Sequence, residues 1–207
     1  MQVKVWGRHN STNVKKVLWC LEELSLPYQR IDAGGAFGVV DEPAYVAMNP
    51  NRLVPCVQDG DLVLWESNAI VRYLASRYGE TTLWRVDPVV RFEADKWMDW
   101  VTSSLASPFK VLFWNMVRTP PGERQMGEVR KAFQTCSDLL ALADQALAAQ
   151  PYLSGERFGM GDIPLGSFAY AWFEMPIERP EHKHLQAWYD RLCERPAFRS
   201  AVMIPLS

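Results

Sequence analysis

The sequence predicts a small α/β domain followed by an all-helical domain. Three observations favour this fold class: strands and helices alternate through residues 1–79, a hairpin signal lies within that region, and helical patterns follow it. The chain has 207 residues, of which 48% are hydrophobic, and nine tryptophans. This length and composition allow a substantial core, in one large domain or in two small ones.

The first half opens with a strand, a helix and a second strand. Residues 2–6 alternate polar and apolar side chains, and residues 13–24 place apolar side chains on one helical stripe. Pro27 ends the helix, and residues 28–31 have the pattern of a second strand. Because a helix connects the two strands, we expect them to be parallel. Residues 44–48 are expected to form a short helix.

A hairpin signal follows. Residues 54–58 and 62–65 are short and apolar, and Gly60-Asp61 between them is a turn pair typical of hairpins. Residues 67–78 are then expected to form a helix that packs one apolar face on this sheet.

Two features of this hairpin region indicate a function. Pro55 starts a strand, where proline cannot donate to the ladder, so a special backbone geometry is expected, with a cis bond as one option. Glu66 and Ser67 place a carboxylate and a hydroxyl at a helix N-terminus, and Ser67 can cap that helix. The free amides of such an end bind anions, and the carboxylate can hold an ammonium. A ligand with an α-amino acid head would fit.

The second half reads as helical. Residues 1–79 are predicted as the α/β domain, residues 80–86 as a linker and residues 87–207 as the helical domain. Pro108 is expected either to kink the first long helix or to begin a new segment, and Pro196 is expected to end the last helix. The expected helices cover residues 89–117, 123–149, 162–173 and 181–195.

Charge and hydropathy exclude several classes of function. The net charge is −2 with both signs mixed along the chain, so no basic block indicates nucleic-acid binding. Lys15 and Lys16 are interpreted as a solvated helix face. The start of the chain has no apolar run of signal-peptide length, and no stretch is long enough to span a bilayer. The sequence predicts a soluble cytoplasmic protein with no membrane or nucleic-acid partner.

The cysteines and histidines do not form a metal-ligand pattern. The cysteines lie far apart and are interpreted as buried reduced thiols. They are Cys20, Cys56, Cys136 and Cys193. Of the three histidines, His182 and His184 are two residues apart and would point to different faces of a helix. We therefore expect no metal site.

The arrangement as a whole resembles a known family. A small domain of this order, with proline at the start of its third strand, resembles the thioredoxin fold. Followed by an all-helical domain, it resembles cytosolic glutathione transferases over nearly the whole chain, and in particular bacterial members of the serine type and the nu class. The motifs that carry the resemblance are Val54-Pro55, the segment 66–70, and Ser11-Thr12-Asn13-Val14 before the first helix.

One further motif departs from the family pattern. Residues 155–163, with Asp162 at a helix start, are similar to the folding motif of the family. Gly159 stands where the family usually has a capping Ser or Thr. Glycine is a workable cap, so this difference does not change the expected fold.

The resemblance implies a glutathione-binding site in the first domain. The main chain of Val54 would pair with the cysteinyl unit of glutathione, and Pro55 would be cis. Glu66 and Ser67 would hold the γ-glutamyl head, in agreement with the ligand inferred above. For the glycyl carboxylate the candidate is Arg52, with Arg8 and Lys15 as further candidates. The implied glutathione-binding residues are Thr12, Arg52, Leu53, Val54, Pro55, Glu66 and Ser67.

The sulfur of glutathione needs a group that favours the thiolate, such as a hydrogen-bond donor or a helix N-terminus. Residues 8–13 contain neither Tyr nor Cys, so a tyrosine-type site and a mixed disulfide are not expected there. Ser11 matches the serine of the serine-type classes, and Asn13 matches the asparagine of the nu class. We take these two as catalytic, with Thr12 as a competitor. The alternative is that all three only cap the helix.

The resemblance leaves three functions open. A glutathione transferase would add the thiolate to an electrophilic, apolar small molecule, for which Phe113 and Trp114 could form a pocket wall, unless they are core residues. A nu-type enzyme would use glutathione to reduce disulfides. A scaffold protein would have kept the fold without turnover. The family also implies a homodimer, with glutathione as co-substrate and no metal cofactor.

Overall fold

The computed structural model describes residues 2–207, and its first half contains a four-stranded sheet in the order β2-β1-β3-β4. Strands β1 and β2 are parallel, as predicted, whereas β3 is antiparallel to both β1 and β4. The observed β2 and β4 have the predicted bounds, β1 begins one residue later than predicted, and β3 begins two residues later and ends one residue later. The strands are β1 (Val3–Trp6), β2 (Tyr28–Ile31), β3 (Cys56–Asp59) and β4 (Leu62–Trp65).

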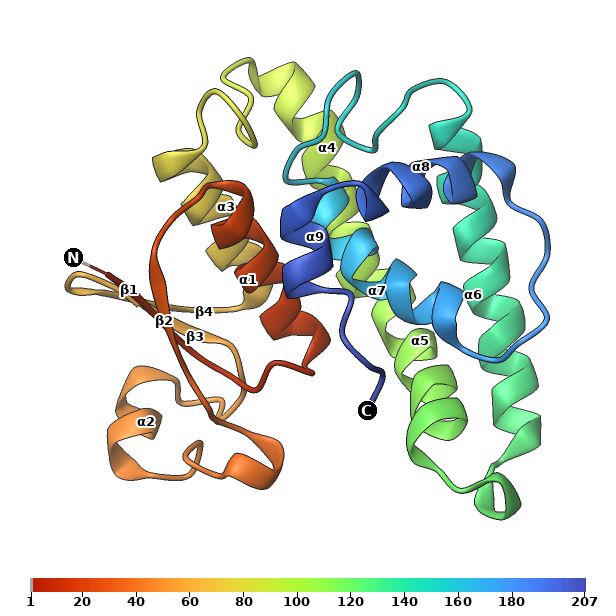
Figure 1. The fold of residues 1–207 in the computed structure, drawn as a ribbon, viewed down its shortest axis with the longest axis horizontal. Helices are drawn as coiled ribbons and strands as arrows, with labels where there is room; N and C mark the ends of the chain where they lie inside the picture. The colour runs from red at the N-terminus through yellow and green to blue at the C-terminus, as the bar shows by residue number, and fades with distance from the viewer. Residues whose placement is uncertain (1) are drawn as a thin grey trace.

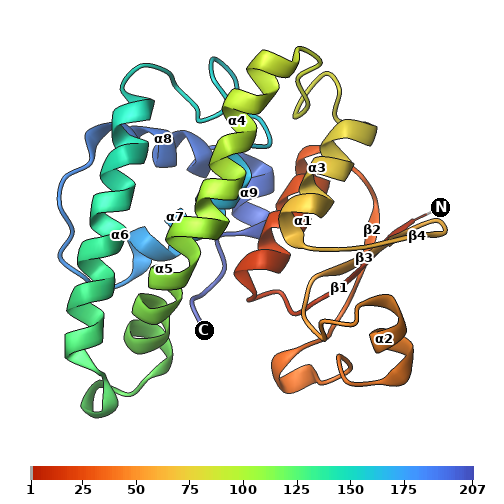
Figure 2. The same cartoon turned by 180° about the vertical axis from the view of Figure 1, so that it is seen from behind.

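Helices cover both faces of this sheet. Helices α1 (Thr12–Glu23) and α3 (Ser67–Tyr78) lie on the face toward the helical half, and α2 (Pro43–Met48) lies on the other side of the sheet (Figures 1 and 2). A short 3-10 turn at Gly35–Phe37 precedes α2. This is the predicted α/β architecture, with the helix over residues 67–78 where it was expected.

Helix α1 is enclosed from two sides. It packs on α3 and the sheet, and its other side contacts α7 (Asp162–Glu174) and α9 (Pro196–Ala201). Trp19 is fully buried there, with its ring 4.8 Å from that of Phe198. Because the second half covers the face that a lone amphipathic helix would expose, Lys15 and Lys16 are only 6% and 2% exposed. The interpretation of these lysines as a solvated face was wrong.

The second half is helical, as predicted, but its first long helix is divided. A π-helical turn interrupts it at Val101–Leu105, and a second π-helical turn ends it at Trp114–Arg118. Pro108 lies in the first turn of the segment that follows the first π turn, where its missing N–H is tolerated. The helices are α4 (Pro88–Trp100), α5 (Ala106–Phe113), α6 (Met126–Leu147) and α8 (Lys183–Cys193), with a 3-10 turn at Pro121–Glu123. Pro196 begins α9, whereas we had expected only that it would end the preceding helix.

The departure at Gly159 has a structural explanation. Ser154 accepts a hydrogen bond from the N–H of Gly161 (3.1 Å), so its hydroxyl serves this helix start from a more distant position. A Cβ at Gly159 would lie 2.9 Å from that same hydroxyl. The buried carboxylate of Asp162 accepts from the indole of Trp188 (2.8 Å) and from three backbone N–H groups. Ser154 thus replaces the missing cap, and the glycine leaves room for it.

Candidate active site

The loop before α1 borders a cavity between the two halves of the molecule. This cavity has a volume of about 360 Å³. From the first half it is lined by Arg8, Asn10, Ser11, Thr12 and Asn13. From the second half it is lined by Ala106, Phe109, Lys110, Phe113, Trp114, Arg118 and Phe168. The structure therefore brings the predicted sulfur-site residues together with the predicted pocket residues Phe113 and Trp114.

Ser11 is at the N-cap of α1, but its hydroxyl does not act as a cap. The residue has extended backbone angles and accepts the first helical hydrogen bond through its carbonyl, from the N–H of Lys15 (2.9 Å). Its side chain makes no capping hydrogen bond, and it is half-buried at the cavity. The hydroxyl is therefore available to a ligand at an electropositive helix end.

Asn13 connects this loop to the second predicted part of the site. The hydroxyl of Ser67 lies 3.3 Å from the side-chain oxygen of Asn13. Ser67 had been expected to cap α3, but the N-cap is Glu66, which has a positive φ of 70°. The side chain of Ser67 is turned away from its own helix end and toward α1. The start of α1 and the start of α3 thus form one polar cluster, with Glu66 exposed at its edge.

The peptide bond between Val54 and Pro55 is cis, as the sequence and the resemblance indicated. The carbonyl of Leu53 is held in place because it accepts from the hydroxyl of Tyr45 (2.6 Å) and from the side-chain amide of Asn49 (2.8 Å). Leu53 is itself 65% exposed, and Val54 is half-buried. The two hydrogen bonds to Leu53 thus hold the backbone next to Val54 in place, while Val54 itself stays partly accessible to solvent.

The three cations considered for the glycyl carboxylate have different surroundings. Arg52 is exposed, has a φ of 55° and lies 3.4 Å from Asp41, so it is near the Val54 turn but already weakly paired. Arg8 lines the cavity described above. Lys15 donates to the carbonyl of Val202 (2.9 Å), a contact deep between the two halves, and does not line the cavity.

Comparison with known proteins decides the family. Residues 1–76 match the family described as Glutathione S-transferase, N-terminal domain, and residues 94–196 match Glutathione S-transferase, C-terminal domain. The chain belongs to the glutathione S-transferase family. Glutathione S-transferase GstB of Escherichia coli (strain K12) is 48% identical to the transferase over 207 residues, which cover 99% of this chain and 100% of GstB.

Solved structures agree with this assignment. The theta class glutathione S-transferase of Xanthomonas axonopodis pv. citri, solved with glutathione bound, is 59% identical to the transferase with a TM-score of 0.96, covering 99% of each chain. A glutathione S-transferase of Pseudomonas fluorescens is 26% identical, with a TM-score of 0.84, covering 95% of this chain and 97% of that one. The chain is thus an enzyme of the glutathione transferase type, with a thioredoxin-like first half and a helical second half.

The four cysteines of the transferase are free thiols, and most of them are buried. Cys20, Cys56 and Cys136 are buried, and Cys193 is half-buried. Burial raises the pKa of Cys56 to about 11 and that of Cys136 to about 12. Such thiols are poor nucleophiles at neutral pH. Within residues 2–207 no group of three or more His, Cys, Asp or Glu side chains could hold a metal, and no helix there has the length and hydrophobicity to cross a bilayer.

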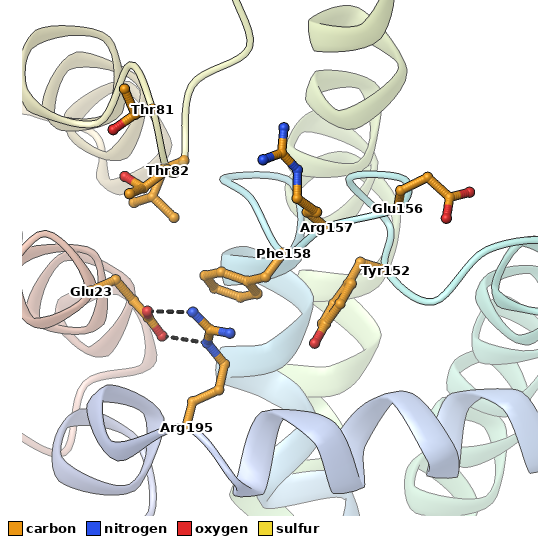
Figure 3. A pocket seen from close by; sticks show the side chains of 9 residues that line it. Glu23, Thr81, Thr82, Tyr152, Glu156, Arg157, Phe158 and Arg195 are labelled. Carbon is orange, nitrogen blue, oxygen red and sulfur yellow. Dashed lines mark hydrogen bonds and ion pairs between the residues drawn. The ribbon is translucent and has the colours of Figure 1, made fainter.

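A second cavity of about 370 Å³ lies at the other end of α1 and contains none of the predicted site residues. Figure 3 shows Glu23 and Arg195 side by side among the residues that line it, joined by two hydrogen bonds. The guanidinium of Arg195 donates two hydrogen bonds to the carboxylate of Glu23, at 2.6 and 2.7 Å, and lies 4.0 Å from the ring centre of Phe158. Because the charged groups of Glu23 and Arg195 are already paired with each other, we interpret this region as a structural contact between the two halves of the transferase.

Sequence reasoning missed one polar residue of the cluster at α3. The ammonium of Lys16 lies 3.5 Å from the hydroxyl of Ser67 and 3.4 Å from the side-chain oxygen of Asn68. Burial lowers the pKa of Lys16 to about 8. A local signal was available, because Lys16 lies three residues after Asn13, which places the two side chains on one face of the helix. Phe109 and Phe168 of the cavity had no such signal.

Proposed function

We propose that the transferase binds glutathione along the start of β3 and α3, with the sulfur at the hydroxyl of Ser11. The observation that carries this proposal is the uncapped hydroxyl of Ser11 at the cavity, at the N-terminus of α1. A donor at that point and the positive end of the helix both favour the thiolate over the thiol. Asn13, which lies at the same helix start, would orient or assist the donor.

The rest of the peptide fits the neighbouring elements. The accessible backbone of Val54, next to the cis bond to Pro55, can pair with the cysteinyl unit. Glu66 and Ser67 would hold the ammonium and the carboxylate of the γ-glutamyl head. Thr12 and Leu53 would border the peptide, and Arg52 or Arg8 would meet the glycyl carboxylate. Of the earlier candidates, Lys15 is left out, because its ammonium is engaged by Val202.

The electrophile would enter the cavity between Ser11 and the aromatic residues of the second half. There the thiolate attacks the electrophilic carbon, an S–C bond forms, and the leaving group departs with its electron pair. Phe113 and Trp114 give the electrophile an apolar surface, because Trp114 is 50% exposed and both line the cavity. These side chains therefore favour an aromatic or apolar substrate.

The experiment follows the ultraviolet absorbance of bound glutathione across pH. We expect the thiolate to form well below pH 8.5, the approximate pKa of a free thiol, together with conjugation of chlorodinitrobenzene. Hydroxyethyl disulfide tests the nu-type alternative, for which the match at Asn13 is the supporting feature. A bound thiol with an ordinary pKa and no conjugation would contradict the proposal.

The family resemblance also supports a homodimer in the cytoplasm, and we include both in the proposal. The large exposed apolar side chains Val89 (73%) and Phe92 (59%) on α4 are available for a subunit contact. Light scattering at micromolar concentration tests the dimer, and a monomer mass would contradict it. The division of the chain at residue 79, with a linker over residues 80–86, likewise stays a prediction.

A further inference from the structure

Lys16 is a buried cation that the proposed reaction has not yet used. Its side chain is 2% exposed, and no carboxylate within residues 2–207 forms an ion pair with it. Burying an ammonium without a counter-ion costs free energy, so such a group is retained where something compensates the charge. The ring of Phe168, 5.5 Å from the ammonium, compensates it only in part.

The polar atoms near Lys16 lead to the start of α3. The side-chain amide of Asn68 donates to the carbonyl of Met98 (2.7 Å) and to the hydroxyl of Thr102 (3.0 Å), and this fixes its oxygen toward Lys16. Because an ammonium can only donate, the hydroxyl of Ser67 accepts from Lys16 and keeps its proton for the oxygen of Asn13. A hydrogen-bonded chain thus runs from the buried charge to the glutathione site.

We propose that Lys16 is the internal counter-charge for the α-carboxylate of the γ-glutamyl unit, acting through Ser67 and the N-terminus of α3. This inference rests on the proposed glutathione site. When the carboxylate binds at Ser67, the buried ammonium gains a second opposite charge, in addition to that of Glu66. The same charge polarises Ser67, whose one proton goes to the oxygen of Asn13 in the free protein and to the carboxylate once it is bound. Lys16 is therefore a positioning residue and does not itself touch the sulfur.

The protonation of Lys16 should change on binding. Facing it, Glu66 from the start of α3 is the charged group that raises its pKa, while burial, the larger effect, lowers it to about 8. Phe168 from α7 is uncharged, and the neighbouring Lys15 lies over the ring of Tyr170 (5.3 Å) and donates to the carbonyl of Val202. A bound carboxylate favours the charged form, so at pH 8 binding should take up about half a proton.

The test uses S-methylglutathione, which has no thiol, in calorimetry at pH values from 7 to 10 in buffers of different ionisation enthalpy. The variants are Lys16→Met and, as a matched control, Lys15→Met, which removes a second buried ammonium of the same helix. We expect wild type and Lys15→Met to bind alike and to take up protons at pH 8. Lys16→Met should bind about ten- to a hundredfold more weakly and lose that part of the uptake.

Three results would decide against the inference. Equal affinity and equal proton uptake in Lys16→Met and wild type would make Lys16 a packing residue. An absence of uptake in wild type at every pH from 7 to 10 would also overturn the proposal, and this measurement does not depend on whether a variant folds. If wild type does not bind S-methylglutathione at all, the glutathione site itself is misassigned, and this outcome differs from the other two. The amino group of the ligand contributes equally in all proteins compared.

The charge of the cavity at Ser11 supports a second, independent inference. Arg8, Lys110 and Arg118 line it, and no Asp or Glu is among its lining residues. Arg118 is engaged, because it donates to the main-chain oxygen of Ser207 (2.8 Å), and both burial and the charge of Arg8 lower its pKa. Within residues 2–207, Arg8 and Lys110 form no ion pair.

We infer that the electrophile carries an anionic group, such as a carboxylate, on an aromatic ring. The ring would lie against Phe113 and Trp114, and the anion would meet Lys110 or Arg8. The matched substrates are 4-chloro-3,5-dinitrobenzoate and its neutral amide. In both, the glutathione thiolate attacks the carbon that bears chlorine, the C–S bond forms, and chloride leaves with the electron pair of the C–Cl bond.

The measured quantity is the ratio of kcat/KM for the benzoate to that for the amide. We expect wild type to prefer the benzoate, and Lys110→Met to lower the ratio about two- to fivefold, a size typical of an exposed charge pair. The control is Lys131→Met, an exposed lysine on α6 that should leave the ratio unchanged. An unchanged ratio in both Lys110→Met and Arg8→Met overturns the inference. If these variants instead weaken only glutathione binding, the cations hold its glycyl carboxylate.

Discussion

The two ends of α1 show opposite ways of using polar groups at a contact between the two halves. At its C-terminal end, Glu23 and Arg195 make two short hydrogen bonds to each other, and the indole of Trp19 also donates to Glu23. At its N-terminal end, the hydroxyl of Ser11 makes no capping bond and the cavity is lined by cations without carboxylates. The two cavities are of similar size.

The difference shows why cavity size alone does not find a site. Paired groups have already gained the hydrogen bonds that a ligand would offer, so they stabilise the fold. Unpaired donors and cations lower their free energy only when a ligand arrives. The first kind of contact should respond to substitution in stability, and the second should respond in binding and catalysis. The predictions below test this separation.

The largest effect is expected at Ser11. Ser11→Ala removes the proposed donor to the glutathione sulfur, so turnover should fall about a hundredfold, as when one donor to a developing charge is removed. The pKa of bound glutathione should rise, with its affinity changed less. Ultraviolet absorbance of the thiolate across pH measures this directly. A shift in Thr12→Val or Asn13→Ala, and none in Ser11→Ala, would assign the donor to another residue.

The next effect concerns the γ-glutamyl head. Glu66→Gln and Ser67→Ala should each weaken glutathione binding by about 1.5–3 kcal/mol, because each removes a partner of a charged group. Folding should survive, since Ile70 and Leu74 keep the apolar face of α3. Calorimetry with glutathione gives the affinity, and Glu80→Gln, an exposed residue just after α3, is the control. Wild-type affinity in both variants would move the γ-glutamyl site elsewhere.

Much of the first half could be predicted because its signals are local. Pro27 and Gly60-Asp61 break the pattern sharply, and the strands at residues 28–31 and 62–65 have the predicted bounds. The cis bond at Pro55 follows from a proline where a strand begins and from the family resemblance. Each of these signals lies within a few residues of the feature that it predicts.

The errors and omissions come from contacts between distant segments. Lys15 and Lys16 were assigned to solvent because a helical stripe implies one buried face, whereas α7 and α9 cover the other face of α1. On α4, the large apolar side chain of Phe92 is 59% exposed, while Met98 is fully buried. The packing of the second half on the first decides how far these side chains are exposed, and the spacing of Lys16 from Asn13 indicates only that the two share a helix face.

A third prediction tests the paired end of α1. Glu23→Gln leaves the guanidinium of Arg195 partly buried without its counter-ion, because the side chains of the two residues are 10% and 30% exposed. We expect a loss of about 2 kcal/mol in the free energy of unfolding, below the full cost for a buried pair because Arg195 is partly solvated. Urea unfolding measures the loss, with Glu194→Gln as a surface control. Glutathione affinity should not change; a large change would mean that this end also serves the site.

The smallest effect is expected from Lys15, the buried lysine that serves neither cavity. Burial lowers its pKa from 10.5 to about 8, so the unfolded chain binds more protons than the folded one between these values. The contribution of Lys15 to the free energy of unfolding is therefore least favourable below about pH 8. It becomes more favourable as the pH rises above that value. Lys15→Met should remove this dependence, which is worth up to about 1 kcal/mol between pH 7 and pH 8.5, and the other groups that titrate in this range change both proteins alike. Urea unfolding of wild type and Lys15→Met at both pH values measures the difference. If the two proteins change in parallel, the Lys15 ammonium keeps an ordinary pKa through its bond to Val202, and its burial costs less than we infer.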